Sequence, residues 1–342
     1  MKDIKIECLN ESISKIYDII TEFKIDSADQ LHIEDILYEA DIIFNAIDKE
    51  ISDYKKLYDE SSKNNDAIQN EIYKLNKAHN VLYEYTTYLN SSEVSAANNP
   101  YILLYGEGGI GKSHIIADTI MKRNSEGKKS LLLLGQHFKE QNNPFINILR
   151  ILELDCSSEQ LLGKLNQIAE ENKSRIIIFI DALNEGNGKK IWKDYLAGMV
   201  EKFKLFPWLG LVVSIRTEYV ESLFADNSKL ENEFVKVNHQ GFSTLEYDAI
   251  KKYFEFYNIQ FTDIPFAEQE FRNPLFLRLL CEGFKNRKID LSKISFTDVY
   301  SNYLLSINLR TSEICEYSRH INIVEKVINE MVSYKHNAGN NN

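Results

Sequence analysis

The glycine-rich stretch YGEGGIGKSHII, residues 105–116, constrains the fold of this chain more than any other feature. Within it, Gly106, Gly111, Lys112 and Ser113 match the spacing G-x-x-x-x-G-K-[ST]. An apolar run typical of a buried strand precedes the glycines, and further apolar residues follow them. Glycines let successive backbone N–H groups point into one small concavity. The sequence therefore predicts a P-loop between a β-strand and a helix.

The residues of this loop have the chemistry to hold a phosphate chain and Mg²⁺. A helix that begins near Gly111 would bring its positive end to the loop. Lys112 would reach the β- and γ-phosphates, and the Ser113 hydroxyl would ligate Mg²⁺. His114 fits a packing or capping role better than a catalytic one. The predicted nucleotide-binding residues of the loop are Gly106, Glu107, Gly108, Gly109, Ile110, Gly111, Lys112, Ser113 and His114.

A second segment, RIIIFIDALNEG, supplies the acidic residues that such a loop requires. Its isoleucine-rich run predicts a parallel strand buried on both faces. Asp181 follows at the carboxyl end of that strand, where ligands bind in such sheets, so we predict that it serves the Mg²⁺ site. A helix cap is the alternative for Asp181. Glu185 is the candidate for polarising the attacking water, and Asn184 is a candidate for orienting that water or the γ-phosphate.

A third apolar segment, LGLVVSIRTEY, ends with Arg216 at the edge predicted for Asp181. An arginine in that place can contact the γ-phosphate and respond to its hydrolysis. A surface salt bridge is the alternative.

The pattern of apolar residues predicts a doubly wound α/β core between two helical regions. Strands expected at 101–105, 130–134, 175–180 and 209–215 alternate with helices, which is typical of a parallel sheet. Three amphipathic helices precede the polar stretch SSEVSAANNP, interpreted as a linker. The predicted division is an N-terminal helical interaction module at 1–95, a P-loop core at 96–240, an all-helical lid at 241–336 and a disordered tail at 337–342.

Composition narrows the class of protein. The formal net charge of −11 argues against a general nucleic-acid-binding surface, although it permits a local basic groove. The four cysteines lie far apart and form no C-x-x-C pair, which indicates reduced thiols. The first residues lack the apolar core of a signal peptide, and no apolar run has the length of a membrane span. We expect a soluble, cytoplasmic protein with no membrane partner.

The order of the motifs resembles that of STAND-type NTPases, the NACHT-like signalling ATPases, and is most similar to bacterial antiviral STAND (Avs) proteins. The segments that carry the resemblance are GEGGIGKSH, SLLLLGQHF, IDALNEG followed by Trp192, VVSIRTEY and FRNPLFLRLL. The resemblance covers about residue 99 to the end of the sequence. It implies ATP and Mg²⁺ as cofactors and slow, regulated hydrolysis to ADP. One departure is Asn184, where many NACHT proteins carry an acidic residue.

The resemblance also implies roles outside the loop. By this resemblance Pro274, in the segment NPL, would pack near the adenine. The sequence pattern by itself also fits Pro274 as the first-turn proline of an amphipathic helix. From their residues, which show no catalytic constellation, we expect the N-terminal helices to mediate self-association or to bind an effector partner. An unrecognised enzymatic effector is the alternative. Relatives continue into a winged-helix domain and sensor repeats, so the sequence is expected to be a core that lacks them. Two alternatives stay open: an AAA-type or other P-loop ATPase with mechanical or loading work, and a nucleotide-dependent scaffold without hydrolysis.

Overall fold

The computed structural model describes residues 2–22, 28, 30–60, 66–225, 228–261, 269–290, 293–315 and 317–339. Its contacts divide the chain into two compact units. The first unit contains residues 1–105 and 116–237, and the second contains residues 106–115 and 238–342. The glycine-rich loop therefore belongs to the second unit, although it interrupts the first in sequence.

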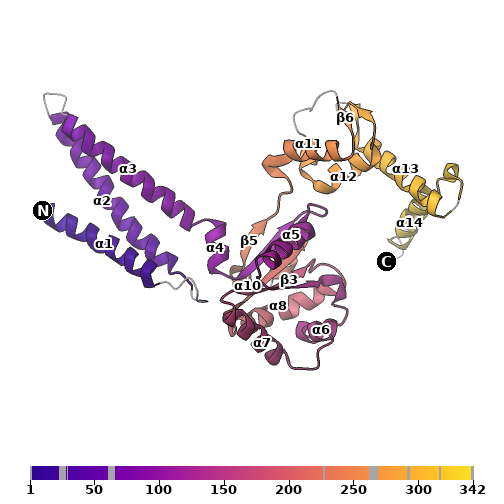
Figure 1. The fold of residues 1–342 in the computed structure, drawn as a ribbon, viewed down its shortest axis with the longest axis horizontal. Helices are drawn as coiled ribbons and strands as arrows, with labels where there is room; N and C mark the ends of the chain where they lie inside the picture. The colour runs from indigo at the N-terminus through magenta and orange to yellow at the C-terminus, as the bar shows by residue number, and fades with distance from the viewer. Residues whose placement is uncertain are drawn as a thin grey trace. The chain divides into compact units, whose positions relative to one another are not determined.

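A five-stranded parallel sheet forms the centre of the α/β core (Figure 1). Its strand order is β2-β3-β4-β1-β5. The strands are β1 (Tyr101–Gly106), β2 (Ser130–Leu134), β3 (Ile176–Asp181), β4 (Leu209–Arg216) and β5 (Val235–Asn238). The predicted doubly wound α/β class is confirmed. The sequence did not predict β5, a four-residue edge strand whose alternate residues are exposed, because so short an amphipathic segment gives little signal.

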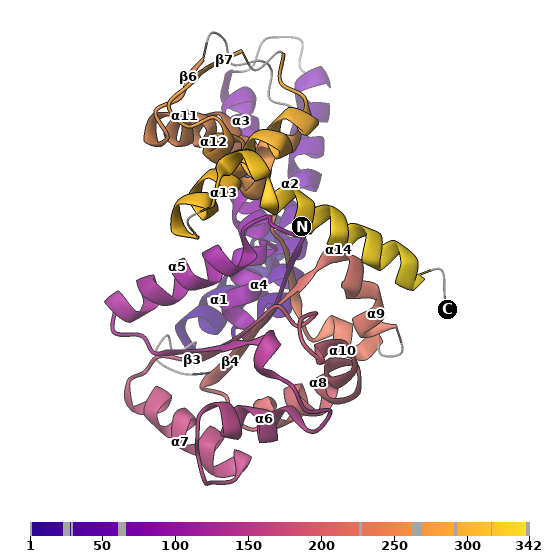
Figure 2. The same cartoon turned by 90° about the vertical axis from the view of Figure 1, so that its right-hand side faces the viewer.

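Helices cover both faces of this sheet, which explains why its central strands are apolar throughout (Figure 2). On one face, Trp192 and Phe203 of α8 and Leu162 of α7 join the large core beneath β3 and β4. On the other face, Ile116 of α5 packs with Phe179 and with apolar side chains of β1 and β4. The helices of this region are α5 (Lys112–Ser125), α6 (Pro144–Ile151), α7 (Ser158–Glu171), α8 (Gly188–Lys204), α9 (Val220–Phe224) and α10 (Ser228–Asn232).

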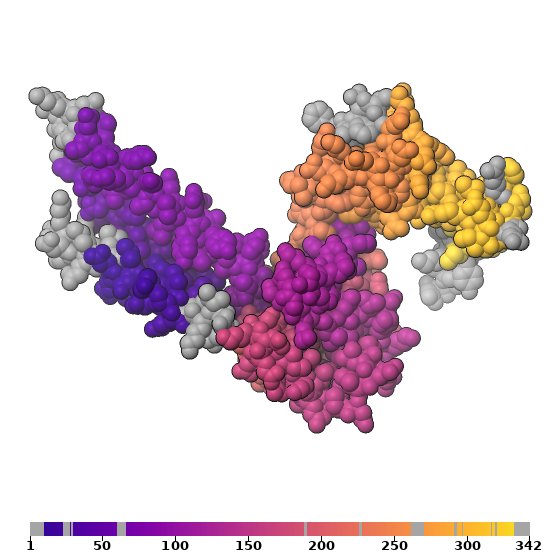
Figure 3. Space-filling view, in the orientation of Figure 1, coloured from indigo at the N-terminus to yellow at the C-terminus, as the bar shows by residue number. Residues whose placement is uncertain are grey.

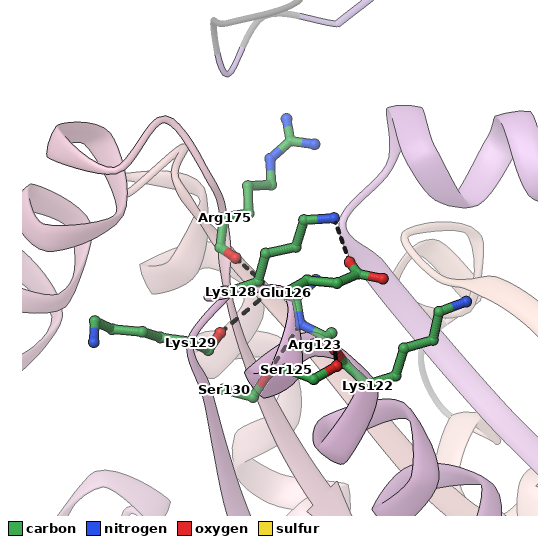
Figure 4. Close-up of polar contacts among 8 residues, drawn as sticks. All are labelled: Lys122, Arg123, Ser125, Glu126, Lys128, Lys129, Ser130 and Arg175. Carbon is green, nitrogen blue, oxygen red and sulfur yellow. Dashed lines mark hydrogen bonds and ion pairs between the residues drawn. The ribbon is translucent and has the colours of Figure 1, made fainter.

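A half-buried arginine ties the end of α5 to the starts of two strands (Figure 4). The Arg123 guanidinium donates from Nε to Ser130 Oγ at 2.9 Å and from Nη2 to the Arg175 carbonyl at 2.6 Å. Burial lowers the pKa of Arg123, and hydrogen bonds to oxygen acceptors offset part of this cost. These contacts fix α5 against β2 and β3.

The N-terminal helices pack as a layer with α2 in the middle (Figure 1; Figure 3). Their bounds are α1 (Lys2–Glu22), α2 (Ile33–Glu60), α3 (Asp66–Leu89) and α4 (Ser92–Asn98). Ile43, Ile47 and Ile51 of α2 form the buried core, against side chains of α1 and α3. The fourth helix, α4, replaces the predicted linker. It forms because the Ser91 side chain accepts from the Val94 N–H and caps the helix start.

The C-terminal part of the second unit contains α11 (Glu246–Phe256), α12 (Pro274–Gly283), α13 (Phe296–Ile314) and α14 (Ile323–Gly339). It is not entirely helical as predicted, because β6 (Gln260–Phe261) and β7 (Lys288–Ile289) form a two-stranded parallel pair. Strands of two residues are too short to leave a periodic signal. α14 continues through residues 337–339 of the predicted tail, and residues 340–342 lie outside the described residues.

Three of the cysteines, Cys156, Cys281 and Cys315, are described as free thiols, while the side chain of Cys8 lies outside the description. Burial raises the pKa of Cys281 to about 12, so this thiol stays protonated at neutral pH.

Candidate functional site

The glycine-rich loop has the backbone of a phosphate cradle. It connects β1, which ends at Gly106, to α5, which begins at Lys112. Gly109 and Gly111 have φ of 74° and 106°, angles that side-chain-bearing residues rarely adopt. Gly106 has a different reason for being glycine, since a Cβ there would lie 2.6 Å from the His239 carbonyl oxygen. The loop therefore presents the N-terminus of a 14-residue helix, a place where anions bind.

The ammonium group of Lys112 is hydrogen-bonded to backbone carbonyl oxygens of this loop. Its Nζ donates to the Gly106 carbonyl at 2.7 Å and to the Glu107 carbonyl at 2.8 Å. Charge-assisted bonds to phosphate oxygens are stronger than bonds to neutral carbonyls. A phosphate chain can therefore attract the ammonium group away from the loop. Ser113 and His114 follow on the first turn of α5, and both are exposed.

Residues from much later in the sequence pack against the loop. A Cβ placed on Gly111 would lie 3.2 Å from His239 Nε2 and 3.7 Å from Pro274 Cγ. A Cβ on Gly109 would lie within 3.0 Å of the Leu275 side chain. Burial and the charge of Lys112 lower the pKa of His239, while its hydrogen bond to the Ile110 backbone opposes them. Pro274 is also the first residue of α12, so the same proline both starts a helix and lies beside the loop.

In the first unit, the acidic residue predicted for Mg²⁺ is buried and oriented. Asp181 ends β3 with 7% of its surface exposed. The fully buried Ser214 of β4 donates from Oγ to Asp181 Oδ1 and accepts from the Ala182 N–H at 2.7 Å. One hydroxyl thus fixes both the carboxylate and the turn that follows it. The bond that the structure describes for the Asp181 carboxylate joins it to the Ser214 hydroxyl of the neighbouring strand.

The turn after Asp181 brings three other predicted residues to the same edge of β3 and β4. The Arg216 N–H donates to Asn184 Oδ1 at 3.2 Å, so Asn184 links the turn to the end of β4. Glu185 is exposed, and its N–H donates to the Ala182 carbonyl at 2.9 Å. The Arg216 guanidinium is half-exposed and lies 4.0 Å from the Glu218 carboxylate. Arg216 thus makes the surface contact considered as its alternative role.

Two glycines permit this turn. A Cβ on Gly135, just after β2, would clash with the Ala182 carbonyl oxygen. Gly186 has φ of 60° and lies against the Gly135 backbone. Ala182 itself has φ of 59°, an unfavourable angle for alanine that its bond to Ser214 helps to hold. The turn therefore depends on a close backbone approach that only glycine allows.

The donor atoms suit Mg²⁺. Ser113 offers a hydroxyl and Asp181 a carboxylate, and both are the hard oxygen ligands that this ion prefers. Among the described residues, no group of three or more His, Cys, Asp or Glu side chains is arranged to hold a metal.

Two contact residues escaped the sequence reasoning, Ser214 and His239. Ser214 left a signal, because it is the one polar side chain inside the apolar run LVVSI. His239 left none, since its role depends on a contact across more than 120 positions of sequence.

Comparison with known proteins finds fold likeness only. No family model matches the chain, and no curated protein matches its sequence. The AMPPCP-bound DnaA of Aquifex aeolicus gives a TM-score of 0.33 at 10% identity, over 70% of this chain and 85% of that one. Aeropyrum pernix ORC1 in complex with DNA gives 0.32 at 16% identity, over 63% and 61%. C. elegans PCH-2 gives 0.28 at 14% identity, over 63% and 62%.

No helix in the described part is both long and apolar enough to cross a membrane. The loop, its flanking strand and helix, and the parallel sheet define a P-loop NTPase fold.

Proposed function

We propose that this chain is an ATP-binding switch of the STAND type that hydrolyses ATP slowly, in antiviral defence. The observation that carries the proposal is the loop itself, in which Lys112 begins α5 and its ammonium group lies on two loop carbonyls. The order of the sequence motifs supports the STAND assignment. The domain division predicted from the sequence, with the N-terminal helices as an interaction module, belongs to the same proposal.

The chemistry follows from the positions of the side chains. Lys112 exchanges its carbonyl partners for phosphate oxygens and neutralises charge on the transferred group. Ser113 and Asp181 would hold Mg²⁺, and the ion would supply positive charge to neutralise the phosphates. Ser214 keeps the Asp181 carboxylate oriented, and Glu185 accepts the proton of the attacking water. Asn184, which also accepts from the Arg216 N–H, would orient that water or the γ-phosphate. The Arg216 guanidinium would contact the γ-phosphate in place of the Glu218 carboxylate.

Slow turnover separates this proposal from its alternatives. A switch holds ATP until a trigger acts, and its ligand acts by preferring one of two conformations. Continuous turnover without a trigger would favour an AAA-type motor. Binding without phosphate release would favour a scaffold.

The test is calorimetric titration of ATP with Mg²⁺ into the wild-type chain and into Lys112→Ala. We expect the variant to lose about 100-fold or more in affinity, because two or more charge-assisted phosphate bonds of about 1.5–3 kcal/mol each disappear. Lys129→Ala, an exposed lysine outside the loop, is the matched control. Equal affinity of wild type and Lys112→Ala would show that this loop is not the phosphate site.

A further inference from the structure

His239 contacts the glycine-rich loop at both of its ends. Its carbonyl oxygen lies close to Gly106, where a Cβ would come within 2.6 Å of it. Its imidazole Nε2 lies against Gly111, 3.2 Å from the position of a Cβ there. The Ile110 backbone, in the middle of the loop, also acts on this ring, because it raises the pKa of His239. A single residue thus spans the whole segment that is proposed to hold phosphate.

The surroundings of the His239 imidazole set its protonation state. Burial and the Lys112 ammonium lower the pKa of His239, and the bond to Ile110 raises it because it favours the protonated donor. The net lowering keeps the ring neutral at pH 7. A neutral imidazole still carries one N–H, which can donate to the Ile110 carbonyl. The ring can therefore offer a hydrogen-bond donor to the loop without adding a second cation beside Lys112.

The residues just after His239 contact the segment that immediately precedes α12. Gly241 has φ of 66°, and a Cβ on it would lie 2.9 Å from the Ile110 side chain. The Phe242 N–H donates to the Arg272 carbonyl at 2.9 Å. Asn273 then caps α12 by accepting from the Leu275 N–H at 2.9 Å, and the Leu275 side chain lies against Gly109. The loop, His239 and the first turn of α12 therefore form one connected set of contacts within the second unit.

We infer that His239 is a positioning residue, which holds the phosphate-binding loop through Ile110 and passes nucleotide occupancy of the loop to α12. This inference rests on the proposed ATP binding. When phosphates draw Lys112 from the Gly106 and Glu107 carbonyls, the loop backbone adjusts. The ring of His239 and the side chain of Leu275 move with it, because both are packed on loop glycines where little free space remains.

The test compares wild type with His239→Phe and His239→Asn. Phenylalanine keeps an aromatic ring against Gly111 and lacks a donor, whereas asparagine keeps a donor on a shorter side chain. His320→Phe, at an exposed histidine of the same unit, is the matched control. Two quantities are measured: ATP affinity by calorimetry, and the ATP-dependent change in amide hydrogen exchange over residues 274–283.

We expect His239→Phe to bind ATP about 5- to 10-fold more weakly, the loss that corresponds to one hydrogen bond of about 1 kcal/mol. It should also lose the ATP-dependent change in exchange over α12. His239→Asn should recover at least half of both effects, which a merely structural ring would not allow. A His239→Phe chain that binds ATP and alters α12 exchange as wild type does would overturn the inference and leave the proposed function intact. A wild-type chain that fails to bind ATP would overturn both.

Discussion

The loop of the second unit and the strand edge of the first hold their charged groups in opposite ways. Lys112 begins an exposed turn, and its ammonium group bonds to backbone carbonyls that a phosphate can replace. Asp181 is buried, and its carboxylate bonds to the fully buried hydroxyl of Ser214. Buried polar groups lose much more than exposed ones when a partner is removed. Changes at the edge should therefore cost stability, whereas changes in the loop should cost binding.

Glu185 lies at the strand edge but is exposed, unlike the buried Asp181. A change at Glu185 should therefore affect catalysis rather than stability. Glu185→Gln keeps the size of the side chain and removes its basicity. We expect it to leave ATP affinity unchanged and to slow hydrolysis by about 10²-fold or more, the scale of a lost general base. Single-turnover phosphate release measures the effect, with the exposed Glu171→Gln as control. Near-normal release would move the role of base to another group.

Ser214→Ala should produce the main stability effect of the edge. The substitution leaves the Ala182 N–H and the Asp181 carboxylate without their buried partner. We expect unfolding free energy to fall by about 2 kcal/mol, within the range for an unsatisfied buried group. Tryptophan fluorescence during urea unfolding reports this unit, because both tryptophans, Trp192 and Trp208, lie in it.

Ser222→Ala is the matched control for that measurement, because its hydroxyl is exposed and donates to the nearby Tyr219 carbonyl. It should change stability by less than about 0.5 kcal/mol. Equal stability of Ser214→Ala and Ser222→Ala would mean that the edge does not depend on the buried hydroxyl.

The extent to which sequence predicts each region follows from how its contacts are arranged. The loop is contiguous, so its glycines, Lys112 and the flanking strand and helix could all be predicted from spacing. Asp181 and Asn184 could be predicted as residues, but their partners come from β4, more than 30 positions away. His239 could not be predicted at all, because packing between distant segments leaves no periodic pattern in a single sequence.

The secondary structure shows the same limit. The buried central strands gave strong apolar signals, and each of the strands predicted from them lies within one residue of its observed ends. The long amphipathic helices of the N-terminal region were also predicted from their periodicity. The segment predicted as a linker is the helix α4, because the capping hydroxyl of Ser91 and the bonds between Asn98 and Leu31 outweigh its loop-like composition. Tertiary contacts decided the structure there.

Ser113→Ala gives the smallest effect and the sharpest contrast with Ser214→Ala. Ser113 is an exposed serine on the first turn of α5, so its loss should change unfolding free energy by less than about 0.5 kcal/mol. ATP affinity in the presence of Mg²⁺ should fall about tenfold, the lower end of what a lost metal-site partner costs. Affinity measured in EDTA should stay unchanged, because without the ion the hydroxyl has no ligand to hold. Ser113→Thr keeps the hydroxyl and should restore the difference between Mg²⁺ and EDTA. A Ser113→Ala chain that loses affinity equally in both conditions would show that the serine contacts phosphate rather than the metal. If Ser113→Ala lowered the unfolding free energy as much as Ser214→Ala does, the loop and the strand edge would not differ in the way proposed above.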